Sequence, residues 1–225
     1  MTDLILLATV LAKKRLLIFD LDGTIADTSL LHEKAFKEVL TPFHVLFDYR
    51  SIAGMTTEAA ITQIFETSGA RSSAAEIKLL VNQKRAAARR LIEDELSFIT
   101  GAEAFIRCAN DAYEMALCSS GSRETVRLTI SKLGLSDVFQ TVVTAEDVIS
   151  HKPHPDGFLQ VLRTTGQFAE NTLVFEDSKS GVESASRAGL EVIQISVADD
   201  EPCFPGAMMQ ADWFDLSVAM LKLKS

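Results

Sequence analysis

The sequence predicts an α/β protein, with a doubly wound parallel sheet and an all-helical insertion after its first strand. Three observations support this prediction. Short, continuously apolar runs alternate with helical patterns over the second half of the chain. The stretch from about 28 to 98 contains helical patterns alone. Acidic or hydroxyl-bearing residues directly follow several apolar runs, which is where ligands bind in open α/β sheets.

Five apolar runs are the candidate strands. Each is short and mainly apolar, which is typical of a strand that is buried on both faces of a parallel sheet. The runs cover residues 16–19, 115–118, 141–143, 172–175 and 192–195.

Helical patterns separate the later runs, at about 122–133, 155–165 and 179–188. Pro155 stands at the start of the second of these helices and Gly189 at the end of the third, which are typical positions for these two residue types. Strands that alternate with helices predict βαβ units, a parallel sheet, and helices on both of its faces.

The insertion has three expected helices, at 30–40, at 57–66 and over a long segment that starts at Ser73. Ser73 and Glu76 have the capping-box spacing that marks a helix start. Because the insertion follows the C-terminal end of a strand, it can cover a site at that edge of the sheet.

The domain organisation follows from this pattern. We expect a core domain of residues 1–27 and 99–225, and a helical cap domain of residues 28–98. The cap should close over a substrate and reopen, so the linkers near Asp27 and Ser97 are the expected hinges.

The overall composition restricts the possible functions. The 225 residues carry a formal net charge of −9, with 47% hydrophobic and 24% charged residues. Nucleic acid and anionic membrane surfaces attract basic proteins, so neither is an expected partner. A site for an anionic substrate must therefore be built locally, from a metal ion, backbone N–H groups and a few cations.

The cysteines and the N-terminal residues favour a cytoplasmic protein. The three cysteines lack CxxC spacing, and Cys108 and Cys118 lie in apolar stretches as expected of small core residues. The apolar run 4–12 is shorter than the ~20 residues of a membrane span, and its flanking charges have the wrong order for a signal peptide. We expect it to form a short helix or turn packed on the domain. The choice between a monomer and a homodimer stays open.

Two aspartates, Asp20 and Asp22, directly follow the first apolar run in the sequence Asp-Leu-Asp-Gly-Thr. In an extended chain, carboxylates two residues apart point the same way and can converge on one atom. Their charges repel each other unless a cation or a shared proton lies between them. Gly23 permits a sharp turn behind the pair. The pattern predicts a cation site at the end of this strand.

Three further polar clusters follow other predicted strands. Ser119 and Ser120 stand at the start of a helix, where hydroxyl and free N–H groups can hold an anion. Lys152 lies in a loop made rigid by prolines and is a candidate phosphate ligand. Glu176 and Asp177 end the fourth run and offer the carboxylate oxygens that Mg²⁺ binds.

Together, the four clusters resemble the four motifs of the haloacid dehalogenase (HAD) superfamily, in that family's order. The resemblance extends over nearly the whole chain and includes a phosphatase-like string from Val174 to Ser178. It implies a Rossmann-like core with an inserted helical cap of the family's type 1. It also implies an Mg²⁺-dependent phosphatase whose substrate is a small phosphorylated metabolite.

The resemblance further implies a role for each polar residue. Asp20 is the expected nucleophile, which becomes an aspartyl-phosphate, and Asp22 is the expected general acid and base. The expected phosphate ligands are Ser119, Ser120 and Lys152. The expected metal ligands are Asp20, Asp22 (through its backbone), Glu176 and Asp177.

Other activities are possible within and outside this family. Asp22 favours phosphate esters, because dehalogenases and phosphonate-cleaving members lack the second aspartate. Sugar phosphomutases of the β-phosphoglucomutase type retain it, and Asp27, Thr28 and His32 resemble their sequence; however, Thr57 stands where their cap carries an arginine. A non-catalytic binding protein on this scaffold would be expected to lack the nucleophile or the acid, and both are present.

The cap contains no motif that names a substrate. Arg50 and Thr57 lie near the expected loop between its first two helices and, with His32, are the candidates for facing the substrate. The basic residues of the long helix, from Lys78 to Arg90, have acidic neighbours such as Glu93 and are interpreted as a solvated face. The alternative is that Lys78, Arg85 and Arg89, which could share a face of this helix, form a second anion-binding patch for the substrate's tail.

Overall fold

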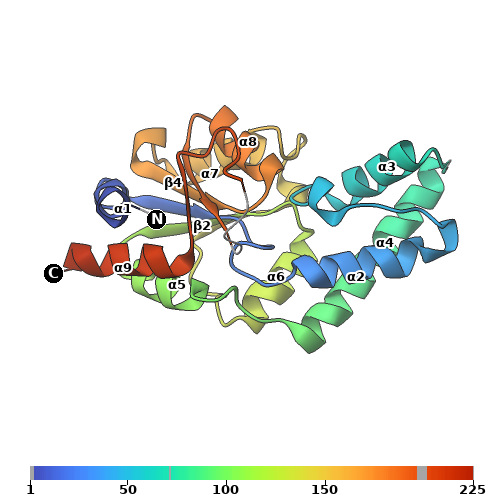
Figure 1. Cartoon of the computed structure of the whole chain (residues 1–225), viewed down its shortest axis with the longest axis horizontal. Helices are drawn as coiled ribbons and strands as arrows, with labels where there is room; N and C mark the ends of the chain where they lie inside the picture. The colour runs from blue at the N-terminus through green and yellow to red at the C-terminus, as the bar shows by residue number, and fades with distance from the viewer. Residues whose placement is uncertain (1–2, 71, 197–201, 225) are drawn as a thin grey trace.

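The computed structural model describes residues 3–70, 72–196 and 202–224. Within these residues, a six-stranded sheet has the order β3-β2-β1-β4-β5-β6, and all neighbouring strands are parallel (Figure 1). The strands are β1 (Leu16–Phe19), β2 (Glu114–Cys118), β3 (Thr141–Val143), β4 (Thr172–Glu176), β5 (Glu191–Ile195) and β6 (Met209–Ala211). The five predicted strands are confirmed. The edge strand β6 was not predicted, because the three residues Met-Gln-Ala are too few to give a periodic or continuously apolar signal.

Helices cover both faces of the sheet, which confirms the doubly wound fold. One face carries α1 (Leu4–Leu11), α5 (Ala102–Asn110), α6 (Arg123–Lys132) and α9 (Trp213–Lys224), and the other carries α7 (Asp156–Thr165) and α8 (Lys179–Arg187). The side chains of β1 alternate between the two apolar layers: Leu17 and Phe19 pack in the first, and Leu16 and Ile18 in the second.

The N-terminal apolar run forms α1, as expected, and this helix packs against α9 with Leu7 and Leu11 buried. None of the helices in the described ranges is long and apolar enough to cross a membrane. Helices α5 and α9 were not predicted. All three cysteines are free, with Cys118 buried in the core and Cys203 exposed.

The aromatic core also supports the loop that carries the two aspartates. Trp213 is buried beside Phe19 and Phe175, with ring centroids 6.0 and 5.3 Å from its own. Its indole Nε1 donates a hydrogen bond to the backbone oxygen of Thr24 (2.8 Å). This hydrogen bond from Trp213, the largest fully buried side chain, fixes the turn directly after Asp22.

Between β1 and β2 the chain forms α2 (Ser29–Leu40), α3 (Thr57–Ser68) and α4 (Ala74–Glu95), which pack on one another around an apolar cluster of their own. Figure 1 shows these helices beside the sheet, beyond the ends of its strands. The predicted capping box is present, since Ser73 and Glu76 each accept a hydrogen bond from the other's backbone N–H.

The two connections of this helical region to the sheet lie side by side. The backbone N–H of Asp27 donates to the oxygen of Ser97 (2.9 Å), and Ala26 forms an antiparallel bridge with Phe98. Paired linkers of this kind suit a hinge. The division into domains that move relative to each other, at 27 and 99, remains a prediction.

Candidate active site

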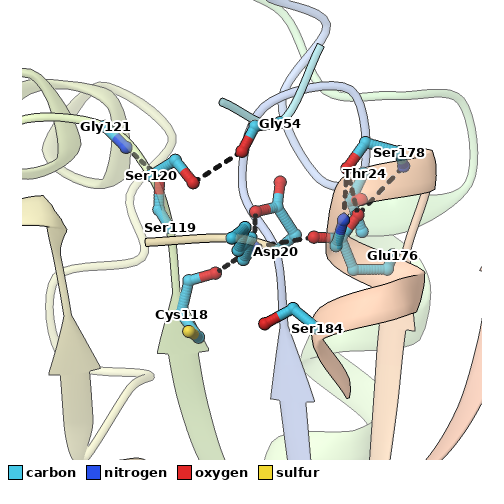
Figure 2. A network of polar contacts seen from close by, with 12 residues as sticks. Asp20, Thr24, Gly54, Cys118, Ser119, Ser120, Gly121, Glu176, Ser178 and Ser184 are labelled. Carbon is cyan, nitrogen blue, oxygen red and sulfur yellow. Dashed lines mark hydrogen bonds and ion pairs between the residues drawn. The ribbon is translucent and has the colours of Figure 1, made fainter. Parts of the chain in front are cut away.

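The polar clusters that follow β1, β2 and β4 meet at one edge of the sheet, because these three strands are neighbours. Figure 2 shows Asp20 above the end of β1, with Ser119 and Ser120 on one side and Glu176 on the other. Lys152 joins them from the loop before α7.

Three acids form a compact group. Carboxylate oxygens of Asp20, Glu176 and Asp177 all lie within 4.8 Å of one another. The ammonium of Lys152 lies 2.6 Å from an oxygen of Asp20 and 2.6 Å from an oxygen of Glu176, and its side chain is only 4% exposed. It also donates to the backbone oxygen of Cys118 at 2.9 Å.

The charges in this group do not balance, which indicates a cation site. Burial raises the pKa of Asp20 to about 8, since Lys152 offsets only part of the effect of burial and of Glu176. Burial, Glu176 and Asp20 also raise the pKa of Asp177 well above its usual range. The three carboxylates exceed the one ammonium by two negative charges. A divalent cation with a preference for oxygen ligands, such as Mg²⁺, fits this donor set.

The position of Glu176 depends on the start of α8. Its Oε2 accepts hydrogen bonds from the backbone N–H (2.9 Å) and the hydroxyl (3.0 Å) of Ser178. A Cβ at Gly181 would overlap the Glu176 carboxylate. Glycine at this position therefore lets the acid lie against the first turn of the helix.

The carboxylate of Asp22 is not part of the acid group and makes different contacts. Its Oδ1 accepts a hydrogen bond from the hydroxyl of Thr28 (2.7 Å) and lies 2.9 Å from Nε2 of His32. The other ring nitrogen of His32, Nδ1, lies 2.9 Å from Nζ of Lys84. A protonated lysine only donates, so Nδ1 accepts and Nε2 carries the hydrogen that His32 donates to Asp22.

This chain of contacts keeps Asp22 ionised. Burial opposes the charged form, but His32, Thr28 and Lys84 outweigh it and lower the pKa of Asp22 to about 2. Burial and the neighbouring Lys84 lower the pKa of His32, which favours its neutral form. Burial lowers the pKa of Lys84 to about 8. Asp22 is therefore an ionised carboxylate with two donors, held apart from the acid group.

The hydroxyls that follow β2 have different partners. The Oγ of Ser119 accepts a hydrogen bond from the backbone N–H of Gly121 (2.9 Å), which leaves its own hydrogen free for an anion. The hydroxyl of Ser120 instead donates to the backbone oxygen of Gly54 (2.6 Å). The Ser120 hydroxyl thus links the core to the helical region, and its expected role as a phosphate ligand is not supported by this contact.

The loop before α3 is seated closely on the core. Besides the contact from Ser120, the hydroxyl of Ser180 donates to the backbone oxygen of Ala53 (3.1 Å). Gly54 has a φ of +75°, and a Cβ there would overlap the hydroxyls of Ser178 and Ser180. Glycine is needed here for both the backbone conformation and the close approach. The helical region is therefore closed over the strand ends in this structure.

A cavity that is open to solvent lies between the helical region and the core. Asp20 and Asp22 line it together with Thr57 and His32. Arg50 is exposed and is not among the residues that line it. Thr57 and His32 are thus placed as the sequence predicts, whereas the structure gives Arg50 no contact with the cavity.

Several residues that were not chosen as site candidates from the sequence also line the cavity. Lys84 is 5% exposed and contacts His32, which corrects the interpretation of the whole basic stretch of α4 as a solvated face. Arg85 and Tyr49 also line the cavity. The burial of Lys84 follows from the packing of α4 on α2, which no local pattern in the sequence reveals.

Comparison with known proteins identifies the family. A family model described as haloacid dehalogenase-like hydrolase matches residues 17–195, a range that includes both the inserted helices and strands β1 to β5. The chain belongs to the haloacid dehalogenase-like hydrolase family. The resemblance of the four motifs to this family is thereby confirmed.

Individual relatives narrow the class within the HAD family. Fructose-1-phosphate phosphatase YqaB of Escherichia coli is 29% identical over 182 residues, which cover 80% of this chain and 95% of the relative. Beta-phosphoglucomutase of Bacillus subtilis is 26% identical over 214 residues, which cover 91% and 92%. This chain is accordingly a phosphatase or phosphomutase of the HAD family.

A solved structure agrees in fold. The crystal structure of CbbY from Rhodobacter sphaeroides in complex with phosphate matches with a TM-score of 0.77 at 24% sequence identity. The match covers 88% of this chain and 93% of CbbY. The α/β core with inserted helices is thus the fold of known HAD proteins.

Proposed function

We propose that this protein is an Mg²⁺-dependent phosphatase that hydrolyses a small phosphorylated metabolite through an aspartyl-phosphate on Asp20. One observation carries the proposal. Asp20 lies both in the acid group with Glu176 and Asp177 and on the wall of the cavity, while Asp22 lines the same cavity with separate hydrogen-bond partners. The two carboxylates therefore have different environments, which suits different roles.

Asp20 would hold the metal ion together with Asp177, and with Glu176 directly or through a water molecule. When bound, Mg²⁺ would neutralise charge on the nucleophile and on the phosphoryl oxygens. Lys152 contributes a fixed positive charge beside Asp20, and the free hydrogen of Ser119 is available for a phosphoryl oxygen.

In the first step, an oxygen of Asp20 attacks phosphorus and the bond to the ester oxygen breaks. The leaving oxygen takes a proton from Asp22. The approaching phosphate adds negative charge near Asp22, which raises its pKa and favours the protonated form needed here. In the second step, Asp22 takes a proton from water, the water oxygen attacks phosphorus, and inorganic phosphate leaves as Asp20 is restored.

Thr28 and His32 are positioning residues for Asp22. Their hydrogen bonds, at 2.7 and 2.9 Å, hold its carboxylate toward the cavity. Both residues lie in or directly before α2, in the proposed cap of residues 28–98. Opening of the cap at the paired linkers would withdraw these partners from Asp22, so closure would assemble the acid–base group only around a substrate.

Removal of the metal tests the first part of the proposal. EDTA should abolish hydrolysis of p-nitrophenyl phosphate, because the acid group then has no cation to balance it. Added Mg²⁺ should restore the rate. Asp177→Asn should raise the Mg²⁺ concentration needed for half-maximal activity by about tenfold or more, as expected for loss of a charged ligand. Full activity in EDTA would refute the metal assignment.

A mutase is the second candidate, supported by the similarity to the beta-phosphoglucomutase of Bacillus subtilis. Thr57 is neutral and lies on the cavity wall, at the position where mutases of this type carry a cap arginine, and this difference favours the phosphatase. With β-glucose 1-phosphate, we expect inorganic phosphate as the product. Phosphate assay and chromatography distinguish the two outcomes, and glucose 6-phosphate as the main product would make the protein a mutase.

A further inference from the structure

Arg85 of α4 has a cationic side chain without a partner at the cavity wall. Among the described residues, its Nε is the one buried side-chain nitrogen or oxygen atom that lacks a hydrogen-bond partner. Within the same part of the chain, no carboxylate forms an ion pair with it. Arg85 as a whole is half-buried, but a buried nitrogen of this kind is costly unless something binds to it.

The neighbouring cations differ from Arg85 in this respect. Lys84 contacts His32 and lies over the ring of Phe36, 4.4 Å from its centroid. Arg89, one helical turn beyond Arg85, forms an ion pair with Glu124 of α6 at 3.0 Å. The contacts of Lys84 and Arg89 fix α4 before and after Arg85. Arg85 is therefore kept at the cavity wall by the position of the helix and not by a partner of its own side chain.

The charged residues that line the cavity come from two parts of the fold. At the strand ends lie Asp20 and Asp22, with Lys152 and the proposed metal ion, where the phosphoryl group would be transferred. Arg85 comes from the helical region, and Ser122 and Thr125, at the start of α6, line the same cavity. The hydroxyls of Ser122 and Thr125 bond to each other (2.9 Å) and do not neutralise a cation. A guanidinium with free N–H groups matches a carboxylate or a phosphate.

We propose that Arg85 binds a second anionic group of the substrate, a carboxylate or a phosphate, at the end away from the phosphoryl group that is transferred. The inference rests on the proposed phosphatase function and specifies its substrate class: phosphate monoesters with an anionic tail. Arg85 is then a specificity residue that contacts substrate without taking part in bond breaking.

Three phosphate esters with the same carbon spacing test this. Hydroxyethyl phosphate has a neutral tail, phosphoglycolate has a carboxylate, and ethylene glycol bisphosphate has a second phosphate. In the Mg²⁺-loaded wild-type protein, kcat/KM for at least one charged-tail ester should exceed that for hydroxyethyl phosphate by about tenfold or more. The preference ratio is kcat/KM for a charged-tail ester divided by kcat/KM for hydroxyethyl phosphate. The charged-tail ester with the larger ratio shows whether Arg85 binds a carboxylate or a phosphate. Arg85→Gln should reduce the ratio to near one, and Arg85→Lys should retain part of it because the charge remains.

Arg89→Gln is the matched control, since Arg89 lies on the same face of α4 but pairs with Glu124. It should keep the wild-type ratio. The inference is overturned if the wild type does not prefer either charged tail, if Arg85→Gln keeps the preference, or if Arg89→Gln loses it equally.

Calorimetric binding of the same three esters separates this inference from the proposed function. The measurement uses the Asp20→Asn protein with Mg²⁺, in which the proposed nucleophile is absent. The two charged-tail esters should bind more weakly to the double variant Asp20→Asn/Arg85→Gln than to Asp20→Asn. This result supports the Arg85 site even if turnover does not proceed through Asp20. Equal binding overturns the Arg85 site and leaves the phosphatase mechanism intact.

Discussion

Asp20→Asn should lose phosphatase activity by about 10⁴-fold or more, because asparagine has no anionic oxygen to attack phosphorus. Asp20 is the one carboxylate that belongs to both the acid group and the cavity wall in the described residues. The measurement is release of p-nitrophenol and inorganic phosphate at saturating Mg²⁺. Asparagine has nearly the same shape as aspartate, so the fold should be kept.

Two controls make this result specific. Thermal unfolding of Asp20→Asn should show no loss of stability, since the substitution removes one of three mutually repelling carboxylates. Glu103→Gln changes an exposed acid of α5 that pairs with Arg107, and it should retain the wild-type rate. Near-normal hydrolysis by a folded Asp20→Asn protein would remove Asp20 from the mechanism.

Asp22→Asn should slow hydrolysis of an alkyl phosphate by about 10²–10⁴-fold, because the alkoxide leaving group then lacks its proton donor. p-Nitrophenolate is a good leaving group and needs no such proton. With p-nitrophenyl phosphate we therefore expect a rapid burst of about one p-nitrophenol per enzyme, followed by slow turnover. The slow phase reports the second step, in which Asp22 would have activated water.

The comparison variant for this effect is Thr28→Val, which removes one hydrogen bond to Asp22 but keeps its carboxylate. It should show a smaller loss than Asp22→Asn and no burst. Stopped-flow absorbance measures both phases. Equal losses on alkyl and aryl phosphates, without a burst in Asp22→Asn, would contradict the acid–base role of Asp22.

Much of the fold could be predicted because the parallel sheet leaves a strong local signal. A strand such as β1 is buried on both faces, so every position from Leu16 to Phe19 is apolar. The capping box at Ser73 and the glycine after α8 mark helix ends through local chemistry. Strand β6 has no such signal, since it is three residues long at the sheet edge and only Ala211 is buried.

The site could be predicted where its residues follow strand ends, and less well where helices pack. Asp20 and Glu176 follow predicted strands, and they are brought together because β1 pairs with β4 in the sheet. The contact between His32 and Lys84 joins residues that are 52 positions apart, on two helices whose faces meet only after folding. No spacing rule connects them. For the same reason, Lys84 could not be distinguished in the sequence from the exposed cations of α4.

The phosphorylated enzyme is the most direct test of the central proposal. Asp22→Asn protein should be mixed with radiolabelled p-nitrophenyl phosphate and Mg²⁺, quenched in acid during the burst, and digested for mass spectrometry. The account predicts a phosphoryl group on the peptide that contains Asp20, and none when Asp20→Asn is treated in the same way. A p-nitrophenol burst without phosphorylation of Asp20, or with phosphorylation at another residue, would contradict it.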